Sequence, residues 1–123
     1  MVIGLLWATL TLALAPPARA SCVLPVADSN AKSPSQPNIE GVITAAKGSL
    51  VEVDSKENVR YPLLLDERTR MFTVYGGFIG VHELVPGQVA RIWLANCRAP
   101  KPGARGRVAV LMLASKKPGE GWP

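Results

Sequence analysis

Hydrophobic and polar residues alternate in short runs from Ile39 onward, and turn-forming residues separate these runs. In residues 49–54, Val51 and Val53 face one way while Glu52 and Asp54 face the other. This alternation predicts a strand with one buried face. A preceding run over residues 39–46 is joined to it by Lys47-Gly48, which predicts a tight hairpin.

The same reasoning predicts further strands along the rest of the chain. Residues 59–65 place alternate apolar side chains on one face, but Pro62 confines this strand to an edge or an irregular position. A strand over 70–75 ends at Gly76-Gly77, and strands over 88–97 and 107–115 flank a Pro/Gly-rich basic loop. Residues 81–84 predict one helical turn.

Five or six strands in so short a chain favour a closed sheet, since a flat one would expose a face and two edges. We therefore expect an all-β fold, a small five- to six-stranded OB-like barrel over residues 39–115. A two-sheet sandwich is the alternative. Residues 116–123 form a tail.

The N-terminal residues have a different pattern. Residues 1–15 are almost wholly apolar and are followed by Ala18-Arg19-Ala20, an A-x-A cleavage pattern. They predict a signal peptide over residues 1–20, and hence a periplasmic or secreted protein. The apolar run is shorter than the roughly 20 residues that a membrane-spanning helix needs, so we expect no transmembrane segment in the mature chain. The alternative is the buried N-terminal helix of a cytosolic protein.

Residues 21–38 are rich in Ser, Pro and Asn, and predict a flexible arm. The chain's two cysteines are Cys22, in this arm, and Cys97. In an oxidising compartment an even pair is a candidate disulfide. The alternative is two unpaired thiols.

The formal net charge of +5 belongs mainly to the C-terminal third of the chain. From Arg91 onward only Glu120 is acidic, whereas seven residues are basic. This asymmetry suits an anionic polymer or an envelope protein as partner, although a solvated loop and tail is the alternative interpretation.

Three segments also resemble a known group of proteins. These are Gly41-Val42-Ile43-Thr44, residues 50–54 with the Thr69 corner, and residues 84–93, Leu-Val-Pro-Gly-Gln-Val-Ala-Arg-Ile-Trp. They are similar to a group of uncharacterised exported bacterial domains with an OB-like barrel, in which a "G-x-I" hairpin and an "L-x-x-G-x-V" turn recur. The resemblance spans residues 39–115 and implies a fold, but no activity.

Catalysis and cofactors are not expected. The chain has one histidine, His82, and no G-x-S-x-G motif that would indicate a nucleophilic serine. Asp66 and Glu67 are adjacent, so on a strand they would point to opposite faces and could not act as a pair of catalytic carboxylates. Exported OB-like copper(I) carriers bind the ion with one histidine and two methionines beside a tryptophan, and this chain has the same residue types in His82, Met71, Met112 and Trp93. A periplasmic copper carrier is therefore the alternative function. In those carriers, however, the two methionines lie close together in sequence.

Binding through the barrel face is the main functional hypothesis. Arg91 and Trp93 lie on one side of a strand, where an aromatic ring beside guanidinium groups can stack on a ligand. Alternatively, Trp93 fills the core with Val89 and Cys97. Nucleic acid is disfavoured by export, so we expect a non-catalytic binding or accessory module of the envelope. Its candidate ligand or partner surface comprises Arg91, Trp93, Arg98, Lys101, Arg105 and Arg107.

Overall fold

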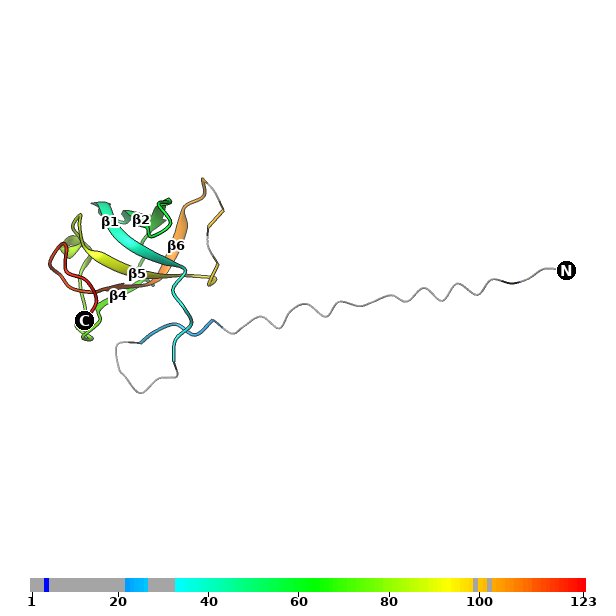
Figure 1. Ribbon diagram of the computed structural model, residues 1–123, viewed down its shortest axis with the longest axis horizontal. Coiled ribbons are helices and arrows are strands. Elements are labelled where there is room, and N and C mark those ends of the chain that lie inside the picture. The colour runs from blue at the N-terminus through cyan, green and yellow to red at the C-terminus, as the bar shows by residue number, and fades with distance from the viewer. Residues whose placement is uncertain (1–3, 5–21, 27–32, 99, 102) are drawn as a thin grey trace.

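The computed structural model describes residues 4, 22–26, 33–98, 100, 101 and 103–123 (Figure 1). The predicted signal peptide, apart from Gly4, and the middle of the predicted arm lie outside these residues. The described part contains six strands and one turn of 3-10 helix. Their bounds are β1 (Ile39–Lys47), β2 (Leu50–Ser55), β3 (Arg60–Leu64), β4 (Arg70–Thr73), η1 (Val81–Glu83), β5 (Val89–Leu94) and β6 (Gly106–Leu113).

Five of these strands close into a barrel. β1, β2 and β3 form an antiparallel meander, and β5 pairs antiparallel with the other side of β1. β6 is antiparallel to β5 and parallel to the end of β3, where Leu63 lies opposite Gly106 and Leu64 opposite Arg107. This parallel contact completes the ring β1–β2–β3–β6–β5. The predicted small OB-like barrel is confirmed, and the alternative two-sheet sandwich is wrong.

The remaining strand, β4, extends the sheet outside the ring. It pairs parallel with the second half of β6, from Arg70 opposite Val110 to Thr73 opposite Leu113. β3 and β4 therefore lie one after the other along the same side of β6. The corner between them brings residues 65–69 to the middle of β6.

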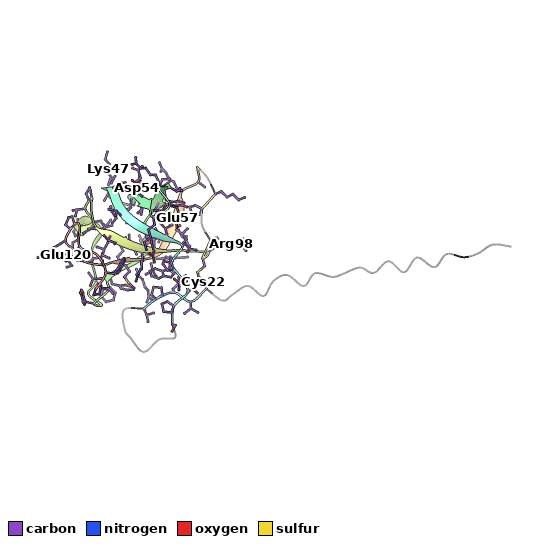
Figure 2. The ribbon with its side chains drawn as sticks, in the orientation of Figure 1. Cys22, Lys47, Asp54, Glu57, Arg98 and Glu120 are labelled. Atoms are coloured by element: carbon purple, nitrogen blue, oxygen red, sulfur yellow. A yellow bond between two sulfur atoms is a disulfide. The ribbon has the colours of Figure 1, made fainter. Side chains whose placement is uncertain are left out.

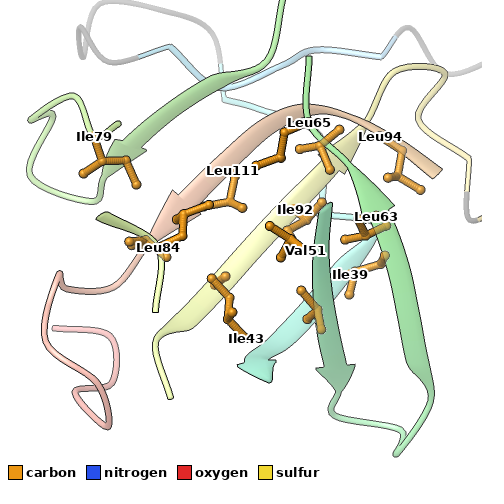
Figure 3. Packing of buried hydrophobic residues seen from close by; sticks show 14 residues of the cluster. Ile39, Ile43, Val51, Leu63, Leu65, Ile79, Leu84, Ile92, Leu94 and Leu111 are labelled. Atoms are coloured by element: carbon orange, nitrogen blue, oxygen red, sulfur yellow. The ribbon is translucent and has the colours of Figure 1, made fainter. Parts of the chain in front are cut away.

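Alternating side chains build the core inside the barrel (Figure 3). Val51 and Val53 of β2 are buried, as their alternation with Glu52 and Asp54 predicted. Burial of such aliphatic side chains is the main contribution that stabilises a domain of this size. The largest fully buried side chains of this main core are Ile39, Ile43, Leu63, Ile92, Leu111 and Leu113.

Local sequence signals also appear where they were expected. The predicted tight hairpin joins β1 and β2, but its two turn residues are Gly48 and Ser49, because Lys47 still pairs with Leu50; Gly48 has a φ of 56°. η1 is the predicted helical turn. Pro62 lies opposite Glu52 of β2. On the other side of β3, pairing with β6 begins only at Leu63. Because Pro62 precedes that pairing, its missing N–H interrupts no hydrogen bond between β3 and β6.

The described parts of the arm and the tail both pack on the barrel. The Asn38 N–H donates to the Ile92 carbonyl at 2.9 Å, and the Asn38 side chain accepts from the Leu94 N–H at 2.9 Å. In the tail, the Gly119 N–H donates to the Gly87 carbonyl at 2.8 Å. No helix in the described ranges is long and apolar enough to cross a membrane.

Candidate functional site

The predicted surface residues fall into two separate groups. Arg98, Lys101 and Arg105 lie in the loop between β5 and β6, and Arg107 is the second residue of β6. Arg91 and Trp93 lie within β5 itself. The two groups differ in exposure and in partners, so they do not form one surface.

Trp93 is buried, with 2% of its surface exposed. It packs on the outer face of the sheet with Phe72 of β4 and Val110 of β6, in a cluster that Leu24 of the arm also contacts. We call this group the outer cluster. The indole N–H of Trp93 donates to the Ser35 carbonyl at 2.8 Å. The prediction of Trp93 as an exposed stacking ring is therefore wrong, because the arm covers this face.

The alternative position for Trp93, in the core with Val89 and Cys97, is also wrong. The side chains that point into the barrel from β5 are Ala90, Ile92 and Leu94. Successive residues of a strand face opposite sides, so Trp93 points outward.

Arg91 does lie beside an aromatic ring, but the ring is Trp122 of the tail. The guanidinium carbon lies 3.9 Å from the centre of the Trp122 ring. Arg91 Nε also lies 3.2 Å from Glu40 Oε1. Glu40 forms a second ion pair with Lys56, and the hydrogen bond from Lys56, followed by the charge of Arg91, lowers the pKa of Glu40. Arg91 is thus occupied by internal partners.

The loop residues instead border two adjoining hollows beside β6. The first has a volume of about 370 Å³. One wall is the arm segment Leu24, Pro25 and Val26, and the floor is β6 from Arg107 to Val110. Arg68 and Arg70 border it from the β3–β4 corner.

The second hollow, of about 530 Å³, lies under the β5–β6 loop. Its lining includes Arg98, Pro100 and Arg105. Ala95 and Arg107 line both hollows, so the two adjoin at these residues. Lys101 is exposed in the same loop but does not line either hollow.

Positive charge dominates the lining of this double hollow. Five exposed arginines border it, and among the lining residues that the structure describes Asp66 is the one acid; its Oδ2 lies 3.3 Å from Arg107 Nε. We call this surface the arginine groove; it comprises Arg68, Arg70, Arg98, Arg105 and Arg107. Planar guanidinium groups bind carboxylate and phosphate oxygens through paired hydrogen bonds.

Hydrogen bonds fix the β3–β4 corner that contributes Arg68 and Arg70. The Thr69 hydroxyl donates to the Val108 carbonyl of β6 at 2.7 Å. The same hydroxyl oxygen accepts from the Asp66 N–H at 3.0 Å, and Asp66 Oδ1 accepts from the Arg68 N–H at 2.9 Å. The corner is therefore attached to the middle of β6. Sequence reasoning missed Arg68 and Arg70, since acids nearby in sequence balance them.

The disulfide candidates lie at one edge of the groove. Cys22 and Cys97 are at disulfide distance, with Cα atoms 5.8 Å apart and a sequence separation of 75 positions. Figure 2 shows Cys22 and Arg98 together on one side of the barrel, with Glu120 on the other. Such a pair is typical of proteins in oxidising compartments.

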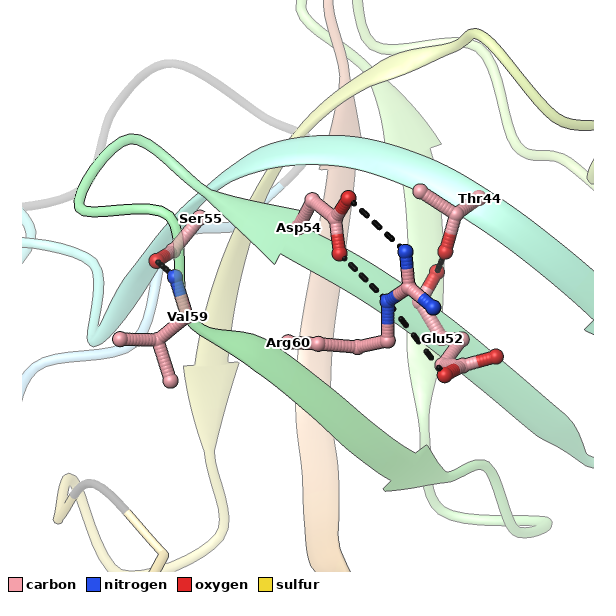
Figure 4. A network of polar contacts seen from close by, with 6 residues as sticks. All are labelled: Thr44, Glu52, Asp54, Ser55, Val59 and Arg60. Carbon is pink, nitrogen blue, oxygen red and sulfur yellow. Dashed lines mark hydrogen bonds and ion pairs between the residues drawn. The ribbon is translucent and has the colours of Figure 1, made fainter.

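The outer face of β2 and β3, where OB folds commonly bind oligonucleotides, carries acidic groups. Arg60 Nε lies 2.8 Å from Asp54 Oδ1 and 3.6 Å from Glu52 Oε1 (Figure 4). The hydrogen bond from Arg60 lowers the pKa of Asp54. Lys47 and Arg105 line a hollow on the same strands together with Glu52. This face therefore carries mixed charge, and the carboxylates of Glu52 and Asp54 make it less suited to a polyanion than the arginine groove.

The proposed copper ligands are not brought together. Met71 packs against the main core, whereas Met112 packs against the outer cluster, on the opposite face of the sheet. His82 is exposed in η1. Within the described residues, no group of three or more His, Cys, Asp or Glu side chains is arranged to hold a metal ion.

A further hollow of about 700 Å³ opens between the β1–β2 turn and η1. Leu65, Met71 and Val81 line it with apolar side chains, and its charged lining residues are Asp66, Glu67 and Arg68. Two carboxylates against one guanidinium give this hollow a weaker charge preference, of the opposite sign to that of the arginine-lined hollows. The arginine groove is thus the candidate site with the clearest chemical preference.

Comparisons of the chain with protein-family models, with curated proteins and with solved structures found no match.

Proposed function

We propose that this protein is an exported, non-catalytic binding module of the cell envelope that holds an anionic polymer in the arginine groove. The observation that carries the proposal is the charge of the groove: its described lining residues include five arginines and one carboxylate, that of Asp66. Two adjoining hollows suit a ligand with repeated anionic groups better than one small anion. Each additional contact then adds to the affinity.

Two further observations support the envelope as its location. Cys22 and Cys97 lie at disulfide distance, as expected in an oxidising compartment. The apolar residues 1–15 and the A-x-A pattern that follows them indicate export.

The test is a titration with inorganic polyphosphate as the probe, in which binding is measured by isothermal titration calorimetry. We expect the double substitution Arg98→Glu/Arg105→Glu to weaken binding by at least about tenfold, because each lost charge-assisted contact contributes roughly 1.5–3 kcal/mol. Lys117→Glu is the control for charge outside the groove, since it reverses one exposed charge in the tail, and its loss of binding free energy is compared with half of that of the double substitution.

The control should bind within about twofold of the wild type, since Lys117 lies outside the groove. Equal losses per reversed charge in the two variants would show that only net charge matters. That result, or an absence of binding by the wild type, would rule out the groove as the ligand site.

A further inference from the structure

The Cys22–Cys97 pair joins the two sides of the arginine groove. The arm segment 24–26, which we call the wall, begins two residues after Cys22 and borders the first hollow. On the other side, Asn96 and Arg98 flank Cys97 and line the second hollow. One covalent link therefore sets the position of the wall relative to the arginine loop.

The other attachments of the wall are weaker. Val23 exchanges two hydrogen bonds with Ser35: its N–H donates to Ser35 Oγ at 2.9 Å, and its carbonyl accepts from the Ser35 N–H at 2.8 Å. Leu24 packs against the outer cluster. Pro25 is buried, and Val26 is 43% exposed. Once the covalent link is lost, these noncovalent contacts are the attachments that the described residues provide, and a segment with few such contacts opens at a lower cost than the barrel unfolds.

The backbone at Cys97 is also held in an uncommon conformation. Its φ is 49°, in the left-handed region that residues with a side chain seldom adopt. The Cys97 N–H donates to the Leu94 carbonyl at 2.9 Å, which closes a turn at the end of β5. A cysteine released from its partner can leave this conformation, and Arg98 follows directly.

The barrel itself does not depend on the pair for its closure. The ring is closed by the β3–β6 contact, and neither cysteine belongs to the main core. Cys22 is exposed, so a thiolate can reach it. Breaking the link thus acts on the groove before it acts on the fold.

We propose that the Cys22–Cys97 disulfide regulates the arginine groove: the oxidised protein holds the anionic ligand, and reduction opens the wall and releases the ligand. This inference rests on the proposed function and adds its regulation. The step is a two-electron thiol–disulfide exchange with a dithiol reductant. The Sγ–Sγ bond breaks, the dithiol is oxidised to its own disulfide, and its two protons end on the cysteine thiols.

The experiment compares polyphosphate affinity before and after reduction with dithiothreitol. We expect reduction to weaken binding at least about fivefold, a common size for coupling between two states. Far-ultraviolet circular dichroism, recorded on the same samples, should show that the strands of the barrel remain folded. The variant Cys22→Ser/Cys97→Ser should match the reduced protein.

A pair of valine substitutions makes the test independent of whether the cysteine variant folds. Val26 and Val59 have nearly equal exposure, 43% and 44%, but only Val26 lines the groove. Val26→Glu should weaken binding to the oxidised protein by at least about threefold, through like-charge repulsion of the ligand. It should have no effect after reduction, when the wall has moved away. Val59→Glu should have no effect in either state.

Each outcome decides between the two proposals. If the oxidised wild type binds and reduction changes neither its affinity nor the effect of Val26→Glu, the regulatory inference is wrong while the proposed function stands. If the oxidised protein does not bind polyphosphate, the proposed function fails and the regulation fails with it.

Discussion

Gly41 shows how one residue determines the pairing of two strands. A Cβ atom at this position would lie 1.9 Å from the Asp54 carbonyl oxygen and 2.8 Å from the Ser55 Cα. Neither atom belongs to a flexible side chain, so no side-chain rotation relieves the clash. The "G-x-I" feature noted in the sequence thus has a steric cause in this barrel, where β1 and β2 approach closely at Gly41.

We expect Gly41→Ala to lower the free energy of unfolding by more than about 2 kcal/mol, because β1 and β2 must separate to admit the methyl group. Gly77→Ala is the control, since a Cβ there meets only Thr73 Oγ1 at 3.7 Å, an ordinary contact. It should remain within about 1 kcal/mol of the wild type. Urea unfolding measures both, and equal stabilities would contradict the steric argument.

At the same scale, Arg91 and Trp93 show what could not be predicted from the sequence. Alternation along β5 placed both side chains on one face, and the structure agrees. What covers that face comes from distant segments: Ser35 accepts from Trp93, and Trp122 lies against Arg91. A local pattern specifies the direction of a side chain, but not the remote segment that packs on it.

The strands themselves followed from the sequence, because hydrophobic alternation and turn residues are local signals. The pairing of β4 did not, since parallel contacts with β6 join residues 40 positions apart, such as Arg70 and Val110. That pairing is what brings Arg68 and Arg70 beside Arg107. The sequence therefore predicted the arginines of the β5–β6 loop and the start of β6, but not the two arginines that the β3–β4 corner contributes to the groove.

The 3-10 turn η1 gives the barrel a pH-dependent element. Glu83 Oε2 accepts from the Gly80 N–H at 2.7 Å, and Oε1 lies 3.1 Å from Lys116 Nζ of the tail. The Gly80 hydrogen bond first, and the bond from Lys116 second, lower the pKa of Glu83 below its ordinary 4.5. Ionised Glu83 thus links η1 to the tail.

A depressed pKa in the folded state stabilises the fold above the ordinary pKa, and this stabilisation is lost as the pH falls through the folded value. We expect the free energy of unfolding to decline below about pH 4.5 in the wild type. Glu83→Gln keeps the acceptor for Gly80 but does not titrate, so its decline should be shallower. Lys116→Met removes the second cause and should have a smaller effect in the same direction. Urea unfolding between pH 3 and 7 measures these slopes; a Glu83→Gln profile parallel to the wild type would contradict the assignment.

Across the whole molecule, charge is segregated between surfaces. The β5–β6 loop, with the arginine groove, extends from one end of the barrel, while the C-terminus lies at the other (Figure 1). The β2–β3 face carries the Glu52, Asp54 and Arg60 network, and Lys47 and Arg105 line a hollow there with Glu52. A net charge of +5 is thus a poor description of this protein, because an approaching polyanion meets mainly positive charge at one surface and mixed charge at another.

This segregation has a consequence for the salt dependence of binding. A polyanion that is neutralised by arginines releases its bound counterions, so the logarithm of affinity falls linearly with the logarithm of salt concentration. The slope counts the contacts, and each arginine removed from the groove should reduce it by about one. We therefore expect Arg98→Gln/Arg105→Gln to reduce the slope for polyphosphate by about two, measured by calorimetry at several sodium chloride concentrations. Lys117→Gln lowers the net charge from outside the groove and should leave the slope unchanged. Equal reductions in both variants would mean that the ligand senses the total charge of the protein, and a localised groove would then be excluded.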